Sequence, residues 1–180
     1  MRNGLPLVFG AIAFVAAVVT VWSYFGGSGG FGAGRAGGPG MLAGAPAQSF
    51  PAKRLDGSEG SLANYRGKVV LVNLWATWCA PCRSETPALE SLYQKDRGRG
   101  LVVLGVDQGE SLGVASDFVR ELKLTYPILV DTEQHYGRAY AAIGLPTSLV
   151  VDRNGHIVQG VDGERTLAEF QRMVDPVLAR

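Results

Sequence analysis

Residues 68–82 read KVVLVNLWATWCAPC, and Cys79 and Cys82 near the end of this run are the only two cysteines in 180 residues. The apolar run at 68–75 is typical of a buried strand, and residues 81–94 are typical of a helix. A Cys-x-x-Cys pair between a strand and a helix predicts a redox-active dithiol. The unpaired N–H groups and the positive dipole end of the helix N-terminus stabilise a thiolate there.

Two other roles for this cysteine pair are weaker. A structural zinc site commonly needs four Cys or His ligands at short spacings, whereas His135 and His156 lie far along the chain and form no ligand motif. A purely structural disulfide across so short a loop removes little entropy from the unfolded chain. We therefore expect a redox-active dithiol, with no bound metal and no cofactor.

The N-terminal residues differ in composition from the rest. Residues 5–25 are 21 residues without a charge, and Arg2 precedes them. About 20 apolar residues cross the hydrocarbon core of a bilayer, and the apolar region of a cleavable signal peptide is shorter, about 7–15 residues. We expect residues 1–25 to be an uncleaved transmembrane signal-anchor, with cleavage and release into the periplasm as the alternative. Arg2 predicts a cytoplasmic N-terminus and an extracytoplasmic domain.

The remaining chain divides into a linker and one domain. Residues 26–44 contain ten glycines in nineteen positions, a composition that predicts a flexible linker. Residues 45–180 have the size of a single domain. This domain carries 15 basic and 16 acidic side chains, and the absence of a basic patch argues against nucleic-acid binding. A dithiol outside the cytoplasm faces an oxidising compartment, so a reductant there needs a partner that keeps it reduced.

Predicted strands and helices alternate along the domain. Strands are predicted at 49–55, 68–75, 101–106, 127–130, 148–151 and 156–158, and helices at 81–94, 114–122 and 133–142, with a last helix that a capping box opens at Thr166. Asn154-Gly155 is a strong hairpin signal between the last two strands. The pattern predicts an α/β domain with a mixed sheet flanked by helices.

Two motifs carry a resemblance to a known family. Residues 67–87 read GKVVLVNLWATWCAPCRSETP, and residues 144–152 read GLPTSLVVD. With both motifs in this order, the chain resembles the TlpA/ResA-like thiol–disulfide oxidoreductases of the thioredoxin superfamily, membrane-anchored proteins that include the reductants of cytochrome c maturation. The resemblance covers residues 47–178. It implies a thioredoxin-like fold that ends in a hairpin and a helix, with the insertion of this subgroup at about 109–142.

The resemblance assigns roles to matching residues. Cys79 matches the attacking cysteine and Cys82 the resolving one, and the start of the helix agrees, since exposure and the dipole favour a thiolate at the first position. Pro146 matches the cis-proline opposite the disulfide. Leu145 is then a binding candidate through its main chain, which in the family pairs with an extended substrate segment. Trp78 is a further candidate substrate contact, as are Ala80 and Pro81 between the two cysteines.

Glu85 matches a glutamate near the active site of this subgroup. It follows Cys82 by three residues, on the same helix face, where a carboxyl group can shift thiol pKa values or transfer a proton. An acid in the first helical turn is also favoured by the helix dipole alone. Asn73 stands where ordinary thioredoxins carry a buried aspartate, which leaves Glu85 as the candidate for that proton role.

The expected function is a disulfide reductase held at the bacterial cytoplasmic (inner) membrane and facing the periplasm. Its expected partners are a disulfide-containing client protein and an upstream membrane thiol reductant. Disulfide oxidase or isomerase activity is the alternative within the class. A thiol peroxidase is disfavoured because Val72 and Ala76 stand where peroxiredoxins carry Pro and Thr. A copper-delivery protein of this fold would have a Cys-x-x-x-Cys pair with a histidine, one residue longer than the spacing here.

Overall fold

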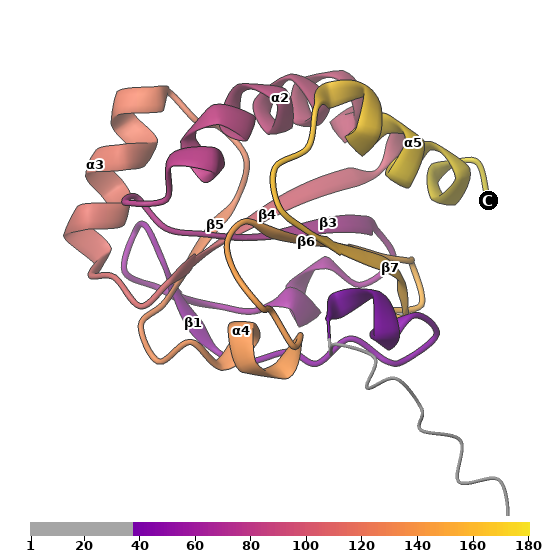
Figure 1. Ribbon diagram of the computed structural model, residues 1–180, viewed down its shortest axis with the longest axis horizontal. Coiled ribbons are helices and arrows are strands. Elements are labelled where there is room, and N and C mark those ends of the chain that lie inside the picture. Colours follow the sequence, from indigo (N-terminus) through magenta and orange to yellow (C-terminus); the bar gives the residue numbers. More distant parts are fainter. Residues whose placement is uncertain (1–37) are drawn as a thin grey trace, which may run out of the picture. The chain divides into compact units, whose positions relative to one another are not determined.

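A seven-stranded sheet runs through residues 38–180, the part of the chain that this computed structural model describes (Figure 1). The strands are β1 (Ala52–Arg54), β2 (Glu59–Gly60), β3 (Val69–Trp75), β4 (Leu101–Gln108), β5 (Ile128–Asp131), β6 (Thr147–Val151) and β7 (Ile157–Asp162). Their order across the sheet is β2-β1-β5-β4-β3-β6-β7. Strands β3, β4 and β5 are parallel neighbours, whereas β1, β2, β6 and β7 pair in antiparallel fashion. The mixed sheet predicted from the sequence is therefore confirmed.

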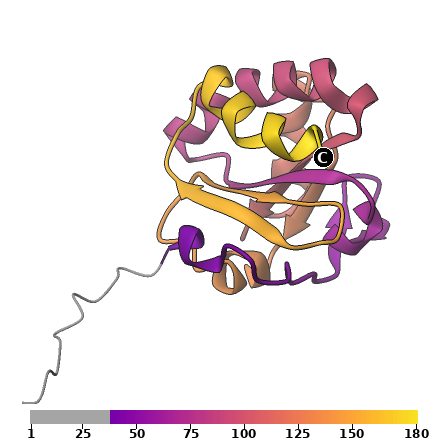
Figure 2. The same ribbon diagram turned by 90° about the vertical axis from the view of Figure 1, so that its right-hand side faces the viewer.

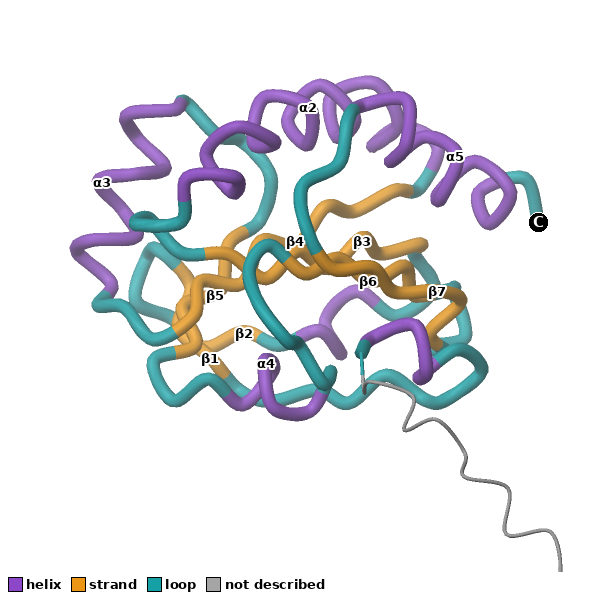
Figure 3. Tube along the Cα trace, in the orientation of Figure 1, coloured by secondary structure: helices purple, strands orange, loops and turns teal. Residues whose placement is uncertain are grey.

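Helices cover both faces of the sheet. The helical elements are α2 (Ala80–Asp96), α3 (Leu112–Leu122), α4 (His135–Ala139) and α5 (Leu167–Leu178), with short 3₁₀ turns η1 (Pro39–Leu42), η2 (Leu62–Tyr65) and η3 (Arg97–Arg99). The long helices α2, α3 and α5 pack on one face, and α4 and the turns η1 and η2 lie on the other (Figures 2 and 3). Each face of the sheet thus has its own apolar cluster.

Strand β3 shows why the two clusters form. All seven of its residues are buried, and alternate side chains of a strand point to opposite faces. Leu71 and Trp75 contact the cluster under α2, and Val72 contacts the other cluster. Asn73 shares the face of Leu71 and Trp75, so this polar side chain points toward α2. The strand therefore supplies both the core and one polar group beneath the cysteine helix.

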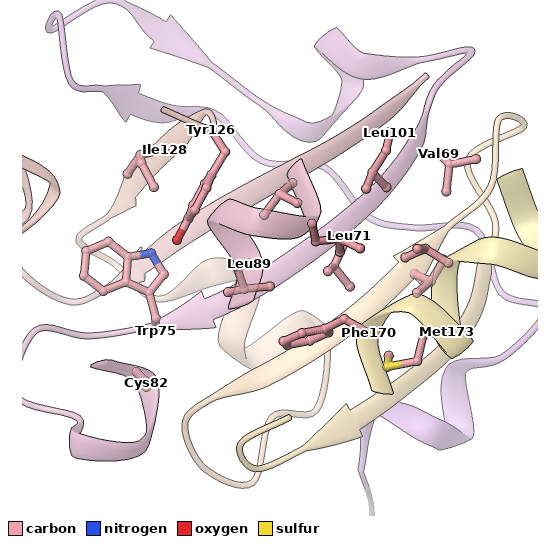
Figure 4. Packing of buried hydrophobic residues seen from close by; sticks show 14 of the residues in the cluster. Val69, Leu71, Trp75, Cys82, Leu89, Leu101, Tyr126, Ile128, Phe170 and Met173 are labelled. Carbon is pink, nitrogen blue, oxygen red and sulfur yellow. The ribbon is translucent and has the colours of Figure 1, made fainter. Parts of the chain in front are cut away.

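The cluster under α2 is built around the end of β3 (Figure 4). Trp75 stacks on Phe118 of α3 with ring centroids 4.6 Å apart, and Leu89 of α2 and Phe170 of α5 are fully buried beside them. Burial of one such side chain contributes roughly 1.5–3 kcal/mol. The start of α2 is therefore supported from below by well-packed apolar side chains.

Most predicted elements are confirmed, with differences at their ends. The capping box at Thr166 forms as expected, with reciprocal bonds between Thr166 and Glu169. Helix α4 is only five residues long, because Gln134 before it has a positive φ of 56° and Ala141 after it one of 50°. The segment 109–142, predicted as the subgroup insertion, contains α3, β5 and α4, and β5 lies within the sheet.

The packed structure begins before the predicted domain boundary. Residues 39–42, which the composition places in the flexible linker, form η1 on strand β7, with Pro39 buried. A side chain at Gly160 of β7 would meet Pro39 at 2.6 Å, so this close approach requires glycine. The folded structure therefore begins at about residue 39, before residue 45, where the domain was expected to start. The predicted membrane span at 5–25 lies outside the described residues, and within residues 38–180 no helix has the length and apolarity to cross a bilayer.

Candidate functional site

The two cysteines form a disulfide at the first turn of α2. The sulfur atoms are 2.03 Å apart, and Cys79 is the N-cap residue, whose Sγ accepts a hydrogen bond from the Cys82 backbone N–H at 3.2 Å. The cysteine pair therefore lies at the N-terminus of a helix, as the sequence predicts. The exposure predicted for Cys79 is not found in this oxidised state, because Cys79 is 4% and Cys82 1% exposed. The two cysteines differ instead in their place in the helix, because Cys79 is the N-cap residue and Cys82 lies within the first turn.

Exposed residues surround the buried disulfide. Trp78 is 72% exposed, and Ala80 and Pro81 are also exposed. Trp78 borders an open groove of about 320 Å³ that Leu145 also lines. The candidate substrate contacts therefore lie at the surface, around a disulfide that is itself covered.

The loop that contains Pro146 has the predicted proline geometry. The Leu145–Pro146 peptide bond is cis. Gly163 donates its backbone N–H to the Pro146 carbonyl at 2.7 Å, and the Thr147 hydroxyl bonds both Gly144 and Asp162. These contacts fix the loop on both sides of Leu145.

The main chain of Leu145 remains open within this fixed loop. Among residues 38–180, its N–H and carbonyl groups make no hydrogen bond to another part of the protein. A segment with open main-chain groups can pair with an extended peptide, which gains affinity from main-chain hydrogen bonds. The resemblance predicted this role for Leu145, and the geometry is compatible with it.

Glu85 is buried on α2 and held by two donors. It is 2% exposed, and its carboxylate accepts hydrogen bonds from Asn73 Nδ2 at 2.7 Å and from the Arg165 backbone N–H at 3.0 Å. Burial raises the pKa of Glu85 to about 7, although these two hydrogen bonds act in the opposite direction. A carboxyl group with this pKa takes up and releases a proton near neutral pH, as a general acid–base requires.

Asn73 connects this carboxyl group to the sheet. Its side-chain amide also donates to Ser148 Oγ of β6 at 3.0 Å, and Asn73 and Ser148 are register partners in neighbouring strands. Ser148 is two residues beyond Pro146. The strand face that carries Asn73 therefore joins the cysteine helix to the proline loop.

A pair of acids that the sequence motifs did not indicate lies near Thr77. Asp107 is the second-last residue of strand β4, lies in register with Trp75 and is fully buried. Glu110 follows in the loop after β4, and its carboxylate accepts hydrogen bonds from the N–H and the hydroxyl of Thr77, both at 2.6 Å. Thr77 stands two residues before Cys79. The sequence did contain a signal for this pair, because Asp107 follows directly after an apolar run that predicts a buried strand. Charged side chains are rarely buried without a partner.

The two acids are linked through the Glu110 backbone N–H, which donates to Asp107 Oδ1 at 3.2 Å. Burial is the largest cause that raises the pKa of Asp107, to about 8, followed by the hydrogen bond with Glu110 and the charge of Glu110. Burial also acts to raise the pKa of Glu110, but the hydrogen bonds from Asp107 and Thr77 outweigh it and lower that pKa. Two adjacent carboxyl groups cannot both ionise easily, so Asp107 holds the proton and Glu110 the charge.

Two further positions bear on alternative functions. Val72 and Ala76, at the positions where peroxiredoxins carry Pro and Thr, are both fully buried apolar residues and offer no group to a peroxide. Within residues 38–180, no cluster of three or more His, Cys, Asp or Glu side chains has the geometry to hold a metal ion.

Comparisons with known proteins agree on one class of chemistry. The model of the AhpC/TSA family matches residues 43–159. The chain is similar to the thiol-disulfide oxidoreductase ResA of Bacillus thuringiensis subsp. konkukian, with 32% identity over 76% of this chain and 80% of the relative. It is similar to ResA of Geobacillus kaustophilus, with 34% identity over 76% and 79%. The crystal structure of a thioredoxin family thiol:disulfide interchange protein from Chlorobium tepidum TLS superposes with a TM-score of 0.66, at 33% identity over 74% of this chain and 95% of that chain.

Proposed function

The chain belongs to the AhpC/TSA family and is a thiol–disulfide oxidoreductase of the ResA type, and from this premise we propose that it is a membrane-anchored reductase of client-protein disulfides outside the cytoplasm. The observation that most supports exchange with a client protein is that Cys79 caps the helix and the main chain of Leu145 is open. One group attacks a client disulfide, and the other holds the client in place.

The proposed reaction passes two electrons to the client. The Cys79 thiolate attacks one sulfur of the client disulfide, that S–S bond breaks, and one client thiolate leaves. The Cys82 thiolate then attacks Cys79 Sγ, which releases the second client thiolate and forms the Cys79–Cys82 disulfide. The two client thiolates take up protons, and an upstream membrane thiol reductant restores the dithiol.

Glu85 has the role of proton acceptor in this scheme. Cys82 must lose its proton before it attacks Cys79, and Glu85 lies one helical turn further along α2. A carboxyl group with a pKa of about 7 is partly ionised at neutral pH and accepts this proton. In the reverse step, the protonated Glu85 returns the proton to the Cys82 thiolate.

Client binding is assigned to the rim of the site. An extended client segment pairs with the main chain of Leu145, and Trp78, Ala80 and Pro81 contact the residues around its disulfide. An exposed tryptophan supplies a large, rigid contact area at low entropic cost. The groove next to Trp78 accommodates a neighbouring client side chain.

Location and pathway rest on the sequence. The uncharged span at 5–25 supports an anchor in the cytoplasmic membrane, and Arg2 before it supports a domain on the periplasmic side. The family resemblance supports a client in cytochrome c maturation. Protease added to spheroplasts is expected to remove the domain, and protection of the domain would contradict this topology.

The decisive experiment is the capture of the client. Cys82→Ser leaves Cys79 to attack but removes the thiol that releases the client, so a mixed disulfide accumulates and its partner is identified after separation without reductant. Cys79→Ser is the matched control and is expected to capture nothing. Equal capture by both variants would contradict the assignment of roles to the two cysteines.

The direction of exchange needs a separate measurement. Alkylation of free thiols in intact cells is expected to find wild-type Cys79 and Cys82 largely reduced, as a reductase supplied by an upstream donor requires. A fully oxidised pair under the same conditions would assign the chain to disulfide formation instead.

A further inference from the structure

The contact between Thr77 and Glu110 lies directly before the reactive cysteine. Both oxygens of the Glu110 carboxylate accept from Thr77, one from its backbone N–H and the other from its hydroxyl, at 2.6 Å each. Hydrogen bonds to an ionised group are roughly twice as strong as neutral ones. Cys79 is tied back to the same loop, because its N–H donates to the Ala76 carbonyl at 3.2 Å. The position of Cys79 therefore depends on where Glu110 holds Thr77.

Asp107 fixes Glu110 in turn. Asp107 Oδ1 accepts the Glu110 backbone N–H at 3.2 Å, whereas Asp107 Oδ2 is buried and accepts no hydrogen bond from any described residue. An oxygen of this kind is costly as half of a carboxylate but satisfied as a hydroxyl that donates. Glu110 is the acid beside this oxygen, and its charge acts to raise the pKa of Asp107.

We propose that Asp107 and Glu110 are positioning residues for Cys79, acting as one proton-sharing pair that holds Thr77 in place while the proton is bound and releases it when the proton is lost. On deprotonation the proton passes to solvent, and two carboxylates then face each other in a buried place. Their repulsion moves the Glu110 carboxylate away from Asp107 and weakens its bonds to Thr77. Exchange at Cys79 is therefore tuned by an acid pair that does not touch the sulfur atoms.

The surroundings of Asp107 favour retention of the proton. Besides Glu110, the charge of Asp131 on the neighbouring strand β5 acts in the same direction, although Asp131 is in register with Gln108 and not with Asp107. Asp131 itself has His135 of α4 at 3.5 Å. Strand β3 on the other side contributes Trp75, which carries no charge. The pair thus stays singly protonated through neutral pH and loses its proton in the alkaline range.

The first test uses the unmodified, oxidised full-length protein, in which Cys79 and Cys82 are disulfide-bonded and do not titrate. The Thr77 and Glu110 backbone amide resonances are followed by NMR from neutral to alkaline pH. Both are expected to shift together in a single step near pH 8, because both N–H groups bond to the acid pair. Two amide signals that stay constant over this range would overturn the proposal.

Variants then separate the proton from the structure. Asp107→Asn keeps a side-chain donor toward Glu110 but cannot lose its proton, so the alkaline step is expected to vanish while the neutral-pH spectrum is retained. Asp117→Asn makes the same chemical change at an exposed position of α3 and is expected to leave the step in place. An alkaline step that persists in Asp107→Asn would also overturn the proposal.

Activity provides the link to Cys79. Glu110→Ala is expected to lower the rate of thiol–disulfide exchange about tenfold or more, because both hydrogen bonds of Thr77 to the charged carboxylate are lost, and Glu110→Gln is expected to recover part of that rate. This inference rests on Cys79 as the attacking cysteine but not on the direction of exchange. The amide step in the oxidised protein fails only if the acid pair is misassigned, whereas a fully oxidised Cys79–Cys82 pair in cells contradicts the proposed reductase role and leaves the amide step unaffected.

Discussion

Glu85 and Asp107 are both buried carboxyl groups connected to the end of strand β3, and they differ in what faces them. Glu85 is met by two donors, Asn73 and the Arg165 N–H, whereas Asp107 is met by a second acid, Glu110. Burial raises the pKa of both. The donors around Glu85 accommodate its ionised form, so it is suited to exchange a proton during turnover. Among residues 38–180, Asp107 accepts a hydrogen bond only from one backbone N–H, so it is suited to keep its proton.

The largest effect is expected when the two environments are made alike. Asn73→Asp replaces a donor to Glu85 with an acid and gives Glu85 the surroundings of Asp107. The pKa of Glu85 should rise further, and the free energy of unfolding of the oxidised protein at pH 8 should fall by about 3 kcal/mol, because Glu85 loses a donor and a second carboxyl group is buried beside it. Urea unfolding at pH 5 and pH 8 measures this loss.

The matched control for this change is Asn154→Asp, at an exposed turn. It alters the same functional group without a buried neighbour and should change stability by less than about 0.5 kcal/mol. Equal stability of Asn73→Asp and wild type at pH 8 would show that water reaches Glu85 and that burial does not separate the two acids.

A smaller effect concerns the pH dependence of stability. A carboxyl group whose folded pKa is raised stabilises the protein fully below its unfolded pKa, and this stability is lost as pH rises to the folded pKa. The window runs from 4.5 to about 7 for Glu85 and from 3.8 to about 8 for Asp107. Glu85→Gln and Asp107→Asn should each remove part of this decline, about 1.4 kcal/mol per unit of raised pKa.

The two variants should differ in where the decline disappears. Asp107→Asn is expected to flatten the curve up to pH 8, and Glu85→Gln only up to pH 7. Denaturant unfolding of the oxidised proteins at intervals of pH gives both curves. Parallel curves for both variants and wild type would mean that neither group titrates with a raised pKa in the folded state.

A third effect should appear at the thiol. In reduced wild type, Cys79 should be alkylated before Cys82 near neutral pH, because it caps the helix. On a Cys82→Ser background only the Cys79 thiol titrates, and Glu85→Gln should lower its pKa by less than about one unit, since a nearby carboxylate repels the thiolate. The pH dependence of alkylation measures this pKa, and an unchanged value would reduce Glu85 to a structural role.

The smallest effect is expected at the exposed edge of the Glu85 site. Ser84 donates to Glu164 at 2.5 Å in an exposed position, and Glu164 acts to raise the pKa of Glu85. Ser84→Ala should change the free energy of unfolding by less than about 0.5 kcal/mol. A loss greater than 1 kcal/mol, measured by urea unfolding, would show that the loop after β7 contributes more to the Glu85 site than its buried contact at Arg165.

Local sequence patterns predicted the cysteine site but not the Asp107–Glu110 pair. The strand before Cys79, the helix after it and the cap position follow from apolar runs and adjacent residues, which are visible in a short window. Pro146 required the family resemblance, because its neighbours in sequence do not determine the isomer. Glu85 was identified for the same reason, although its donor Arg165 is 80 residues away.

The Asp107–Glu110 pair was missed because its contact with Thr77 depends on the register between strands β3 and β4. Thr77 and Glu110 are 33 residues apart, and they meet only because β3 and β4 pair with Trp75 opposite Asp107. The early start of the packed domain was missed for a related reason. A glycine-rich composition predicts flexibility, but Pro39 finds a partner surface at Gly160, which is 121 positions further along.

The pairing of the domain's first ordered residues with the hairpin has a mechanical consequence. Gly44 and Ala45 exchange hydrogen bonds with Ile157, and the Ala47 N–H donates to the Gly155 carbonyl, so residues 44–47 lie along the start of β7. A pulling force that enters through the N-terminal residues meets these bonds and the η1 contact first. Such a force therefore acts first on the edge strand β7. Cys79 follows the central strand β3, so its geometry is expected to be unaffected by a force that separates only these edge contacts.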